Sequence, residues 1–413
     1  MQSNEIQVAI LGAGPAGIFA ALTLSQKKQF EVSLFDINPR PGRKFSQTGS
    51  GRCNITNMGI RSEDYFSGGD LSDFLERYPP EKIREVLSSF GIATIETEDG
   101  WVYPRSFSGI NVTEILANRL TISSVNFFGR TKVHKLSMHG KRFHLDYFPK
   151  SSDFVNFDAV ILASGSKAFP QLSADDSIFT SLSDLGIKCL PFRPALAGLL
   201  LRGKTFDALS GVRLDAEVTL LTRSKPVKTV FGNLIFTSRG VNGPAVMNIS
   251  HLVADQKNVS CQLSINFLSN EAERFITKLF KASQHRSLPL RDLFLSCLPA
   301  RLTDFILAKA GVSQETVCTD IEFGSFKKIL NEFKTFQVPI QDVEGFRNSQ
   351  CCCGGVSFEA FTLPEMESKQ IPGLFFAGEM VDVNGPCGGY NLHWAIASGI
   401  AAAEGCIRRF LTF

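Results

Sequence analysis

VAILGAGPAG, residues 8–17, together with the acidic end of EVSLFD at residues 31–36, carries the strongest fold signal in the sequence. An apolar strand runs into a Gly-x-Gly-x-x-Gly turn, a helix-compatible stretch follows, and a second strand ends in Asp36. Asp36 lies 24 positions after Gly12, close to the spacing of about 20 that a ribose-binding acid has in a βαβ unit. The stretch therefore predicts a dinucleotide site. The alternative is a glycine-rich turn in an ordinary βαβ unit.

Each glycine of this turn has a physical task. Gly12 permits the tight turn, Gly14 lets the backbone approach a pyrophosphate, and Gly17 allows helix and strand to pack closely. Free N–H groups at the start of the helix attract phosphate, and the carboxylate of Asp36 can accept hydrogen bonds from a ribose. The candidate dinucleotide-binding residues of this turn are Gly12, Ala13, Gly14, Pro15, Ala16 and Gly17.

The composition is that of an ordinary globular protein. The chain has 413 residues, which is enough for two or three domains. Its 43 basic and 40 acidic residues nearly cancel, so we expect neither nucleic acid nor an anionic membrane as a partner. We predict no signal peptide and no transmembrane helix. The ten cysteines include no Cys-x-x-Cys pair, so we expect no metal site, and reduced thiols in a cytoplasmic protein.

The pattern of strands and helices divides the chain into three segments. Residues 1–190 alternate strands and helices, and residues 346–413 return to that pattern. Residues 191–345 form a second unit of antiparallel strands, with short helices at about 270–334. We therefore predict an α/β fold, in which a discontinuous Rossmann-type domain carries an inserted domain of barrel-like antiparallel β structure plus a small helical unit.

Local patterns in the first segment give more detailed expectations. Residues 126–136 and 142–148 alternate with period two and are predicted to be strands, and Asn111 is the predicted N-cap of a helix. Residues 157–165 form a buried strand that ends in small residues, which lets the backbone come close to a ligand.

Two longer motifs resemble one known family. Arg43-Lys44 followed by GSGRCNITN at 49–57 resembles the G-R-K…S-G-x-G-R-C-N-x-T-N stretch of a bacterial flavoprotein family. That family includes the BaiN-like and YhiN-like proteins and the aminoacetone oxidases. GLFFAGE at 373–379, Asp382 and GGYNL at 388–392 resemble its G-L-Y-F-A-G-E-x-x-D…G-G-Y-N-L motif. Weaker matches lie between these ends, so the resemblance spans nearly the whole chain.

The resemblance implies FAD, bound non-covalently in an extended form. The sequence agrees independently, because a second glycine-rich strand–helix element some 360 residues after the first suits a long ligand held at both ends. Asp36 would hold the adenosine ribose, and Arg43 and Lys44 would lie near the phosphates or the ribose. The alternative for these two residues is a solvated basic turn. The residues expected to run past the flavin are Ser50, Gly51, Arg52, Cys53 and Asn54.

The C-terminal motif is expected to hold the flavin end of the cofactor. Glu379 and Asp382 would face the ribityl chain or the pyrophosphate, or alternatively start a surface helix. The helix after Gly389 would point its positive end at the pyrimidine edge of the flavin and stabilise negative charge on the reduced ring. Tyr390 and His393 could reach a substrate or simply pack. Further residues expected at the cofactor are Val133, Ala163, Ser164, Gly165, Gly378, Gly389, Tyr390, Asn391 and Leu392.

The cysteines raise the question of thiol chemistry. Reactive thiols need an accessible, electropositive setting, which Arg52 could supply for Cys53, but a small packed residue is the simpler interpretation. Where relatives typically have Gln-x-Thr-x-Gly-Gly, this chain has QCCCGG at residues 350–355. We interpret residues 351–353 as buried small residues near the flavin face, with thiol redox chemistry as the alternative.

The predicted function is that of an FAD-dependent oxidoreductase, in which a hydride moves between a small-molecule substrate and the flavin. The chain has no second Gly-x-Gly-x-x-Gly turn for NAD(P)H, so a nicotinamide would dock only transiently as electron donor, and oxygen or another carrier is the alternative. Amine oxidation and reduction of a C=C bond are both open, and no catalytic acid or base is assigned. We expect the substrate between the two domains. The alternatives are a flavin-dependent RNA-modifying protein and a non-catalytic redox sensor.

Overall fold

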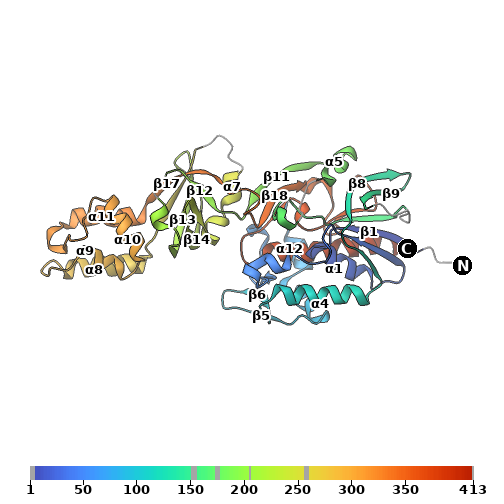
Figure 1. Ribbon diagram of the computed structural model, residues 1–413, viewed down its shortest axis with the longest axis horizontal. Coiled ribbons are helices and arrows are strands. Elements are labelled where there is room, and N and C mark those ends of the chain that lie inside the picture. Colours follow the sequence, from blue (N-terminus) through green and yellow to red (C-terminus); the bar gives the residue numbers. More distant parts are fainter. Residues whose placement is uncertain (1–4, 150–155, 173–176, 204–205, 255–259, 412–413) are drawn as a thin grey trace. The chain divides into compact units, whose positions relative to one another are not determined.

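The computed structural model describes residues 5–149, 156–172, 177–203, 206–254 and 260–411 (Figure 1). Two compact units make up the chain. Unit 1 comprises residues 1–193 and 350–413, and unit 2 comprises residues 194–349. The first unit is therefore discontinuous, and the second is an insertion in it.

A parallel five-stranded sheet forms the centre of unit 1. Its order is β19-β10-β1-β2-β7, which leaves β1 in the middle. The strands are mostly buried and apolar, as expected for a parallel sheet covered on both faces. Their bounds are β1 (Ile6–Leu11), β2 (Phe30–Phe35), β7 (Val125–Phe128), β10 (Ala159–Leu162) and β19 (Leu374–Phe376).

Two helices pack against each other on this sheet. α1 (Pro15–Leu24) begins directly after the glycine turn, with proline at its first position, where a missing N–H costs nothing. α12 (Tyr390–Leu411) is the long C-terminal helix, and it begins at the residue that the sequence predicts. The helices touch closely because Gly399 has no side chain, since a Cβ there would overlap the carbonyl oxygen of Ala16.

The rest of unit 1 surrounds this core. The other helices are α2 (Ser72–Arg77), α3 (Pro80–Ser89), α4 (Gly109–Ile122) and α5 (Ile178–Asp184). The other strands in or next to the unit are β3 (Thr56–Asn57), β4 (Phe66–Ser67), β5 (Thr94–Glu96), β6 (Trp101–Pro104), β8 (Lys132–His139), β9 (Arg142–Phe148), β11 (Cys189–Ala195), β18 (Cys351–Val356) and β20 (Val383–Asn384).

Two local expectations are wrong. The N-cap of α4 is Ser108, whose hydroxyl accepts a hydrogen bond from the backbone N–H of Asn111, so the helix begins before Asn111. Residues 126–136 do not form one strand, because the chain turns at Gly129-Arg130 and Arg130 adopts a left-handed conformation with φ +57°. One part joins the parallel sheet as β7, and the other forms the β8–β9 hairpin.

Unit 2 is a closed antiparallel barrel with a helical extension. The barrel order is β12-β15-β14-β13-β16-β17. These strands are β12 (Leu199–Leu201), β13 (Arg213–Thr222), β14 (Lys225–Phe236), β15 (Gly240–Asn242), β16 (Cys261–Asn266) and β17 (Phe336–Val343). The helices are α6 (Pro244–Met247), α7 (Ser250–Ala254), α8 (Asn270–Ala282), α9 (Leu290–Leu295), α10 (Ala300–Lys309) and α11 (Phe323–Lys334). The predicted fold class is confirmed, since a Rossmann-type sheet and an antiparallel barrel are both present.

A search of the described residues for a helix long and apolar enough to cross a membrane finds none.

The contact between α1 and α12 gives a first prediction. Gly399→Ala adds a methyl group where the Ala16 carbonyl lies, so we expect a loss of about 1–3 kcal/mol of stability from overpacking. Gly324→Ala is the matched control, because Gly324 lies in α11 with open space around its Cα and a helical alanine is favoured by roughly 1 kcal/mol. Thermal unfolding of both variants checks this. Equal melting temperatures for the two would contradict it.

Candidate functional site

In the glycine turn between β1 and α1, the space next to Gly14 is open, whereas the space next to Gly12 and Gly17 is filled by backbone atoms. Gly12 has φ +106°, and a Cβ on it would overlap the backbone of Ala163, while a Cβ on Gly17 would overlap the carbonyl of Gly12. Gly14 differs from both. Its φ is −77°, which any residue adopts, and a Cβ on it would meet nothing within 4 Å. Folding therefore explains Gly12 and Gly17, whereas Gly14 borders space that a ligand can fill.

Asp36 lies beside this turn, at the end of β2. Its carboxylate accepts hydrogen bonds from the backbone N–H of Ala13 and of Asn38, each at 2.7 Å. Burial raises the pKa of Asp36, and the hydrogen bonds from Asn38 and Ala13 oppose that shift. The acid is thus fixed next to the glycine turn, where the sequence predicts a ribose-binding group.

The end of β10 faces the same turn. Ala163 lies against Gly12, Ser164 follows it, and Gly165 has φ +79° with no atom within 4 Å of a Cβ placed on it. The Ser164 hydroxyl is buried and has no hydrogen-bond partner among the described residues. A buried hydroxyl without a partner costs free energy, so it fits a site that a polar ligand completes. The open positions at Gly14 and Gly165 fit a pyrophosphate cradle in the same way.

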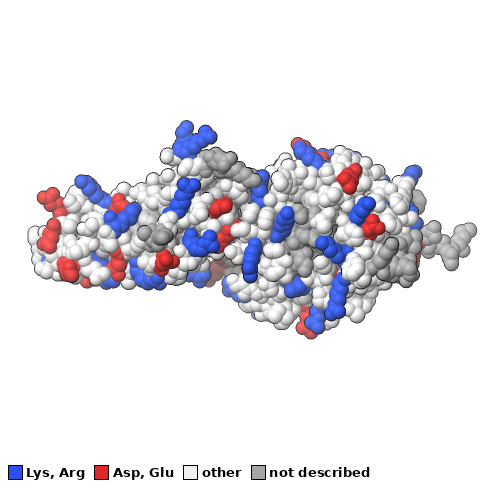
Figure 2. All heavy atoms as spheres, turned by 45° about the horizontal axis from the view of Figure 1, so that its top comes forward, with Lys and Arg blue, Asp and Glu red and all other residues white. Residues whose placement is uncertain are grey.

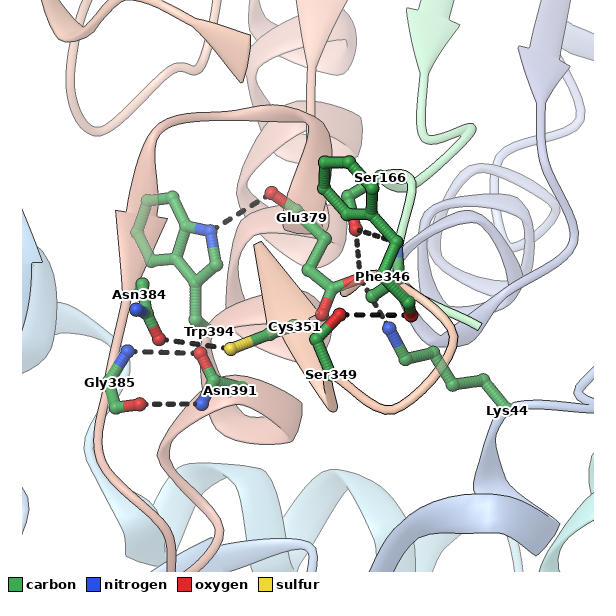
Figure 3. Close-up of polar contacts among 12 residues, drawn as sticks. Lys44, Ser166, Phe346, Ser349, Cys351, Glu379, Asn384, Gly385, Asn391 and Trp394 are labelled. Atoms are coloured by element: carbon green, nitrogen blue, oxygen red, sulfur yellow. Dashed lines mark hydrogen bonds and ion pairs between the residues drawn. The ribbon is translucent and has the colours of Figure 1, made fainter. Parts of the chain in front are cut away.

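The charged residues next to this cradle are paired with each other. Figure 3 shows Lys44 and Ser166 converging on the carboxylate of Glu379. Lys44 forms an ion pair with Glu379, and the Ser166 hydroxyl donates to the same oxygen at 3.1 Å. Arg43 donates to the side-chain oxygen of Asn38. Glu379 therefore holds Lys44 in place, which the sequence could not show because the two residues are far apart in the chain.

Gly378 and Asp382 hold the chain around the end of β19. The N–H of Gly378 donates to the Ser398 hydroxyl at 2.9 Å, and its carbonyl accepts from the Trp394 indole at 3.1 Å. Asp382 is buried and accepts from the backbone N–H of Gly354 at 2.6 Å. These contacts fix the turn after β19, and the cofactor-binding roles of Gly378 and Asp382 stay predictions.

Residues 50–54 form a tight turn with an unusual backbone. Ser50 and Cys53 have φ +56° and +61°, and Gly51 has φ +84°. Arg52 is exposed, whereas burial raises the pKa of the Cys53 thiol to about 12. Cys53 is therefore a packed, protonated thiol at neutral pH and a poor nucleophile.

The same turn meets the start of α12. A Cβ on Gly389, which has φ +98°, would lie 2.8 Å from the side-chain oxygen of Asn54. Asn54 is buried, and neither its amide nitrogen nor its amide oxygen has a hydrogen-bond partner in the described parts of the chain. The structure thus brings residues 50–54 and the N-terminus of α12 together, although some 330 residues separate them in the sequence.

The first residues of α12 are held by their side chains. Asn391 exchanges two hydrogen bonds with the backbone of Gly385, at 3.0 and 2.8 Å, which closes the loop that contains the two glycines (Figure 3). The Tyr390 hydroxyl approaches the carboxylate of Asp64 at 3.2 Å, and burial raises the pKa of Tyr390 to about 12. Leu392 is buried in the core. These contacts fix the helix start and leave its backbone N–H groups for a ligand.

The two helix N-termini are separated by a distance that suits a long ligand. Gly399 of α12 packs against Ala16 at the start of α1. Tyr390 begins α12 nine residues earlier, which is roughly 13 Å along the helix axis. The arrangement therefore offers one positive helix end for a phosphate and a second one, farther along, for the other end of the same molecule.

Two residues that the sequence analysis considers for the site, Val133 and His393, lie in a hairpin and in the core. Val133 is half-buried in the β8–β9 hairpin, where it pairs with Tyr147. His393 is fully buried, and its Nδ1 lies 2.8 Å from the Thr56 hydroxyl. Burial lowers the pKa of His393 to about 4, so the ring is neutral at pH 7 and packs in the core. The sequence analysis missed Ser166 and Thr56, because only the tertiary fold brings them to Glu379 and His393.

The three adjacent cysteines lie in β18 and none forms a disulfide. Cys351 and Cys353 both contact the side-chain amide of Asn384, at 3.1 and 3.3 Å. Cys352 lies near Ser166 and Glu379 instead, and burial raises its pKa to about 12. All three cysteines are buried, and burial raises the pKa values of Cys351 and Cys352, which agrees with a packing role.

The fold and the site define a Rossmann-type flavoprotein oxidoreductase. The family described as "HI0933-like protein Rossmann domain" matches residues 6–405, and the chain belongs to this family. Members of the family are FAD-dependent oxidoreductases, which agrees with the predicted cofactor. The family resemblance predicted from the motifs is therefore confirmed.

Three relatives are similar to the chain over nearly their whole length. A 3-dehydro-bile acid delta(4,6)-reductase of Clostridium scindens is 28% identical over 98% of this chain and 99% of its own. A ribosomal RNA dihydrouridine synthase of Escherichia coli is 28% identical over 98% of each chain. The protein of the same name from Haemophilus influenzae is 28% identical over 95% of this chain and 96% of its own.

The open position at Gly14 gives a direct test of the cofactor cradle. We expect Gly14→Val to keep the melting temperature of the apoprotein, because its backbone is not strained and no atom lies in the way. The side chain would occupy the space of the pyrophosphate, so FAD affinity should fall by on the order of tenfold or more. Flavin fluorescence titration of the apoprotein measures this. Unchanged affinity would show that the cradle lies elsewhere.

His393 gives a prediction on pH. The unfolded imidazole ionises near pH 6.5 and the native one only near 4, so the unfolded state binds the extra proton between these values. The unfolding free energy should therefore fall as the pH drops from about 6.5 to about 4, by roughly 3 kcal/mol for this group. His393→Asn should make the decline shallower, whereas His134→Asn, at an exposed histidine, should not. Urea unfolding across this pH range measures the two slopes.

Proposed function

We propose that this protein is an FAD-dependent reductase that adds hydrogen across a carbon–carbon double bond conjugated with a carbonyl group. The observation that carries the proposal is that α12 begins nine residues, roughly 13 Å along its own axis, before the point where it packs on the start of α1, with open space at Gly14 and a glycine turn at Gly389. This arrangement supports an extended FAD, with its phosphates at α1 and its ring at α12. The substrate would be a small molecule.

The names of the relatives support reduction of a double bond. One relative is named a delta(4,6)-reductase of a 3-dehydro compound, and two are named dihydrouridine synthases. Both names describe hydrogen added to a carbon–carbon double bond. In a 3-oxo compound a double bond at position 4 is conjugated with the carbonyl, and the double bond of the uracil ring is conjugated with a ring carbonyl. These names favour reduction of a conjugated double bond over amine oxidation.

The chain's own residues would bind and orient the reactants. When bound, the flavin would supply the hydride. The start of α12 would stabilise negative charge on the reduced ring, and the hydrogen bonds between Asn391 and Gly385 would hold that helix end in place. NADH or NADPH would be the electron donor and would dock transiently, because the chain has one Gly-x-Gly-x-x-Gly turn.

An anaerobic titration tests this function. We expect the purified yellow protein to be bleached at its flavin band by NADH or NADPH, and the band to return when an α,β-unsaturated ketone is added. Mass spectrometry should show that the ketone has gained two hydrogens. Peroxide formed from amines in air, with no response to either nicotinamide, would contradict the proposal and favour an amine oxidase.

RNA is a second candidate substrate, and one observation favours it. Unit 2 carries 19 Lys and Arg against 14 Asp and Glu, so it holds the positive charge of a chain that is nearly neutral as a whole. Figure 2 shows these basic side chains spread over the visible face rather than gathered in one stripe. Retention on immobilised ribosomal RNA that is lost steeply with added salt would support this candidate.

A redox sensor is the less favoured alternative. Such a sensor needs accessible thiolates, and burial keeps Cys351 and Cys352 protonated and raises their pKa values. Rapid turnover with an unsaturated ketone would argue against a sensor, because a sensor has no substrate of its own.

A further inference from the structure

We propose that Arg52, whose guanidinium lies beside the buried ring of Tyr103, binds the carbonyl or carboxylate oxygen of a flat substrate that packs on the exposed ring of Phe107. This inference rests on the proposed function, since it adds the substrate class and a specificity-determining residue to the same site. We call these three residues the Arg52 cluster.

Arg52 has donors to offer a ligand. Its side chain is exposed, and its guanidinium carbon lies 5.3 Å from the centre of the Tyr103 ring. Within the described residues the structure gives this guanidinium no hydrogen bond and no ion pair with another side chain. The other two cations of the motif differ, because Lys44 is paired with Glu379 and Arg43 donates to Asn38. Arg52 is therefore the cation of this motif that remains available to a substrate.

The exposed Arg52 lies in a turn whose neighbouring residues have strained backbone conformations. Ser50, two residues before it, and Cys53, directly after it, both have left-handed backbones with φ +56° and +61°. Cys53 donates its N–H to the carbonyl of Thr48 at 3.0 Å, and Ile55 donates to that of Val102 at 2.8 Å, which anchors the turn on its buried side. Strained residues of this kind cluster at functional sites, where the fold determines their conformation.

The aromatic rings next to Arg52 form a continuous row. The Trp101 and Tyr103 centroids lie 6.4 Å apart, and those of Tyr103 and Phe107 lie 5.4 Å apart. Trp101 lies against the glycine turn before α12, since a Cβ on Gly388 would be 3.2 Å from its indole nitrogen. Phe107 is 41% exposed, although an aromatic side chain is usually buried.

The row therefore leads from the start of α12 to the surface. The α12 end is where the proposed function puts the flavin ring. At the other end Phe107 is exposed, and so is Arg52, which lies beside the Tyr103 ring. A flat apolar substrate can pack against Phe107 while an oxygen at its edge meets the guanidinium. Arginine suits this task, because its planar fork donates two parallel hydrogen bonds and stacks on aromatic rings.

The chemistry of the reduction uses such a cation. A hydride adds to the alkene carbon farther from the carbonyl, the electron pair of the double bond moves toward the carbonyl oxygen, and a proton from water then adds to the other carbon. The two electrons of the hydride would come from a reduced nicotinamide, by way of the bound flavin. Negative charge grows on the oxygen during this step, so a guanidinium bound to that oxygen stabilises the transition state.

The test compares two flat probes on the oxidised holoenzyme. Benzalacetone is a neutral unsaturated ketone, and cinnamate presents a carboxylate on the same framework. We expect both to shift the flavin absorbance spectrum on binding to the wild type. Arg52→Gln should raise both dissociation constants by about tenfold or more, and cinnamate should lose more, because its oxygens are charged. Arg52→Lys should restore part of the lost affinity for each probe. Phe107→Ala should weaken the binding of both probes by a similar factor.

The controls separate a direct role from a structural one. Arg274→Ala removes an exposed arginine of unit 2 and should change the dissociation constant of neither probe. The melting temperature of Arg52→Gln should match that of the wild type, because Arg52 is exposed, and both probes are titrated at saturating FAD. Unchanged probe affinity in Arg52→Gln would overturn the proposal, and so would a wild type that binds neither probe.

The same experiment distinguishes this inference from the proposed function. Wild-type binding that depends on Arg52, without reduction of benzalacetone by NADH or NADPH, would support the Arg52 cluster and contradict the reductase function. Reduction of benzalacetone with the same KM in Arg52→Gln would support the reductase and contradict the role of Arg52.

Discussion

The close contact between α1 and α12 is the constraint on which the site depends. Gly399 brings the long helix against Ala16, and the turn at Gly378 is fixed to the same helix from both its N–H and its carbonyl, by Ser398 and Trp394. A hydrogen-bonded turn between two packed helices cannot slide by a fraction of a helical turn without losing these contacts. The distance between the two helix N-termini is thereby set by core packing, and the ligand-binding loops are built on a rigid base.

Around this base, the glycines divide into two classes that the motif alone does not separate. Gly12, Gly17 and Gly399 are required by the fold, since a side chain on any of them would overlap backbone atoms. Gly14 and Gly165 border open space. Gly165 also has φ +79°, so its backbone needs glycine in any case, but Gly14 has an ordinary φ of −77°. A glycine that the apoprotein does not need is the strongest local sign that another molecule occupies that place.

The parts of the site that could be predicted from sequence are those that depend on neighbours along the chain. The turn at residues 12–17, Asp36 and the start of α12 follow from local spacing, and the structure has them at the predicted positions. The helix cap at Ser108 was missed because several polar residues near a helix start are similar capping candidates. The pairing of Lys44 with Glu379 depends on the tertiary fold, and no spacing rule connects two residues so far apart in the sequence.

The cysteines show how burial decides between two interpretations of one motif. Three consecutive thiols suggest redox chemistry in a linear sequence, but in β18 they alternate between Asn384 on one side and the surroundings of Ser166 on the other. The amide of Asn384 satisfies the weak polarity of two of them, so they pack as small polarisable side chains. Arg52 is the opposite case, because a strained turn exposes a cation that core packing does not need. Differences in substrate between relatives are therefore to be sought in exposed residues that line the ring end of the site, rather than in the buried strand that supports it.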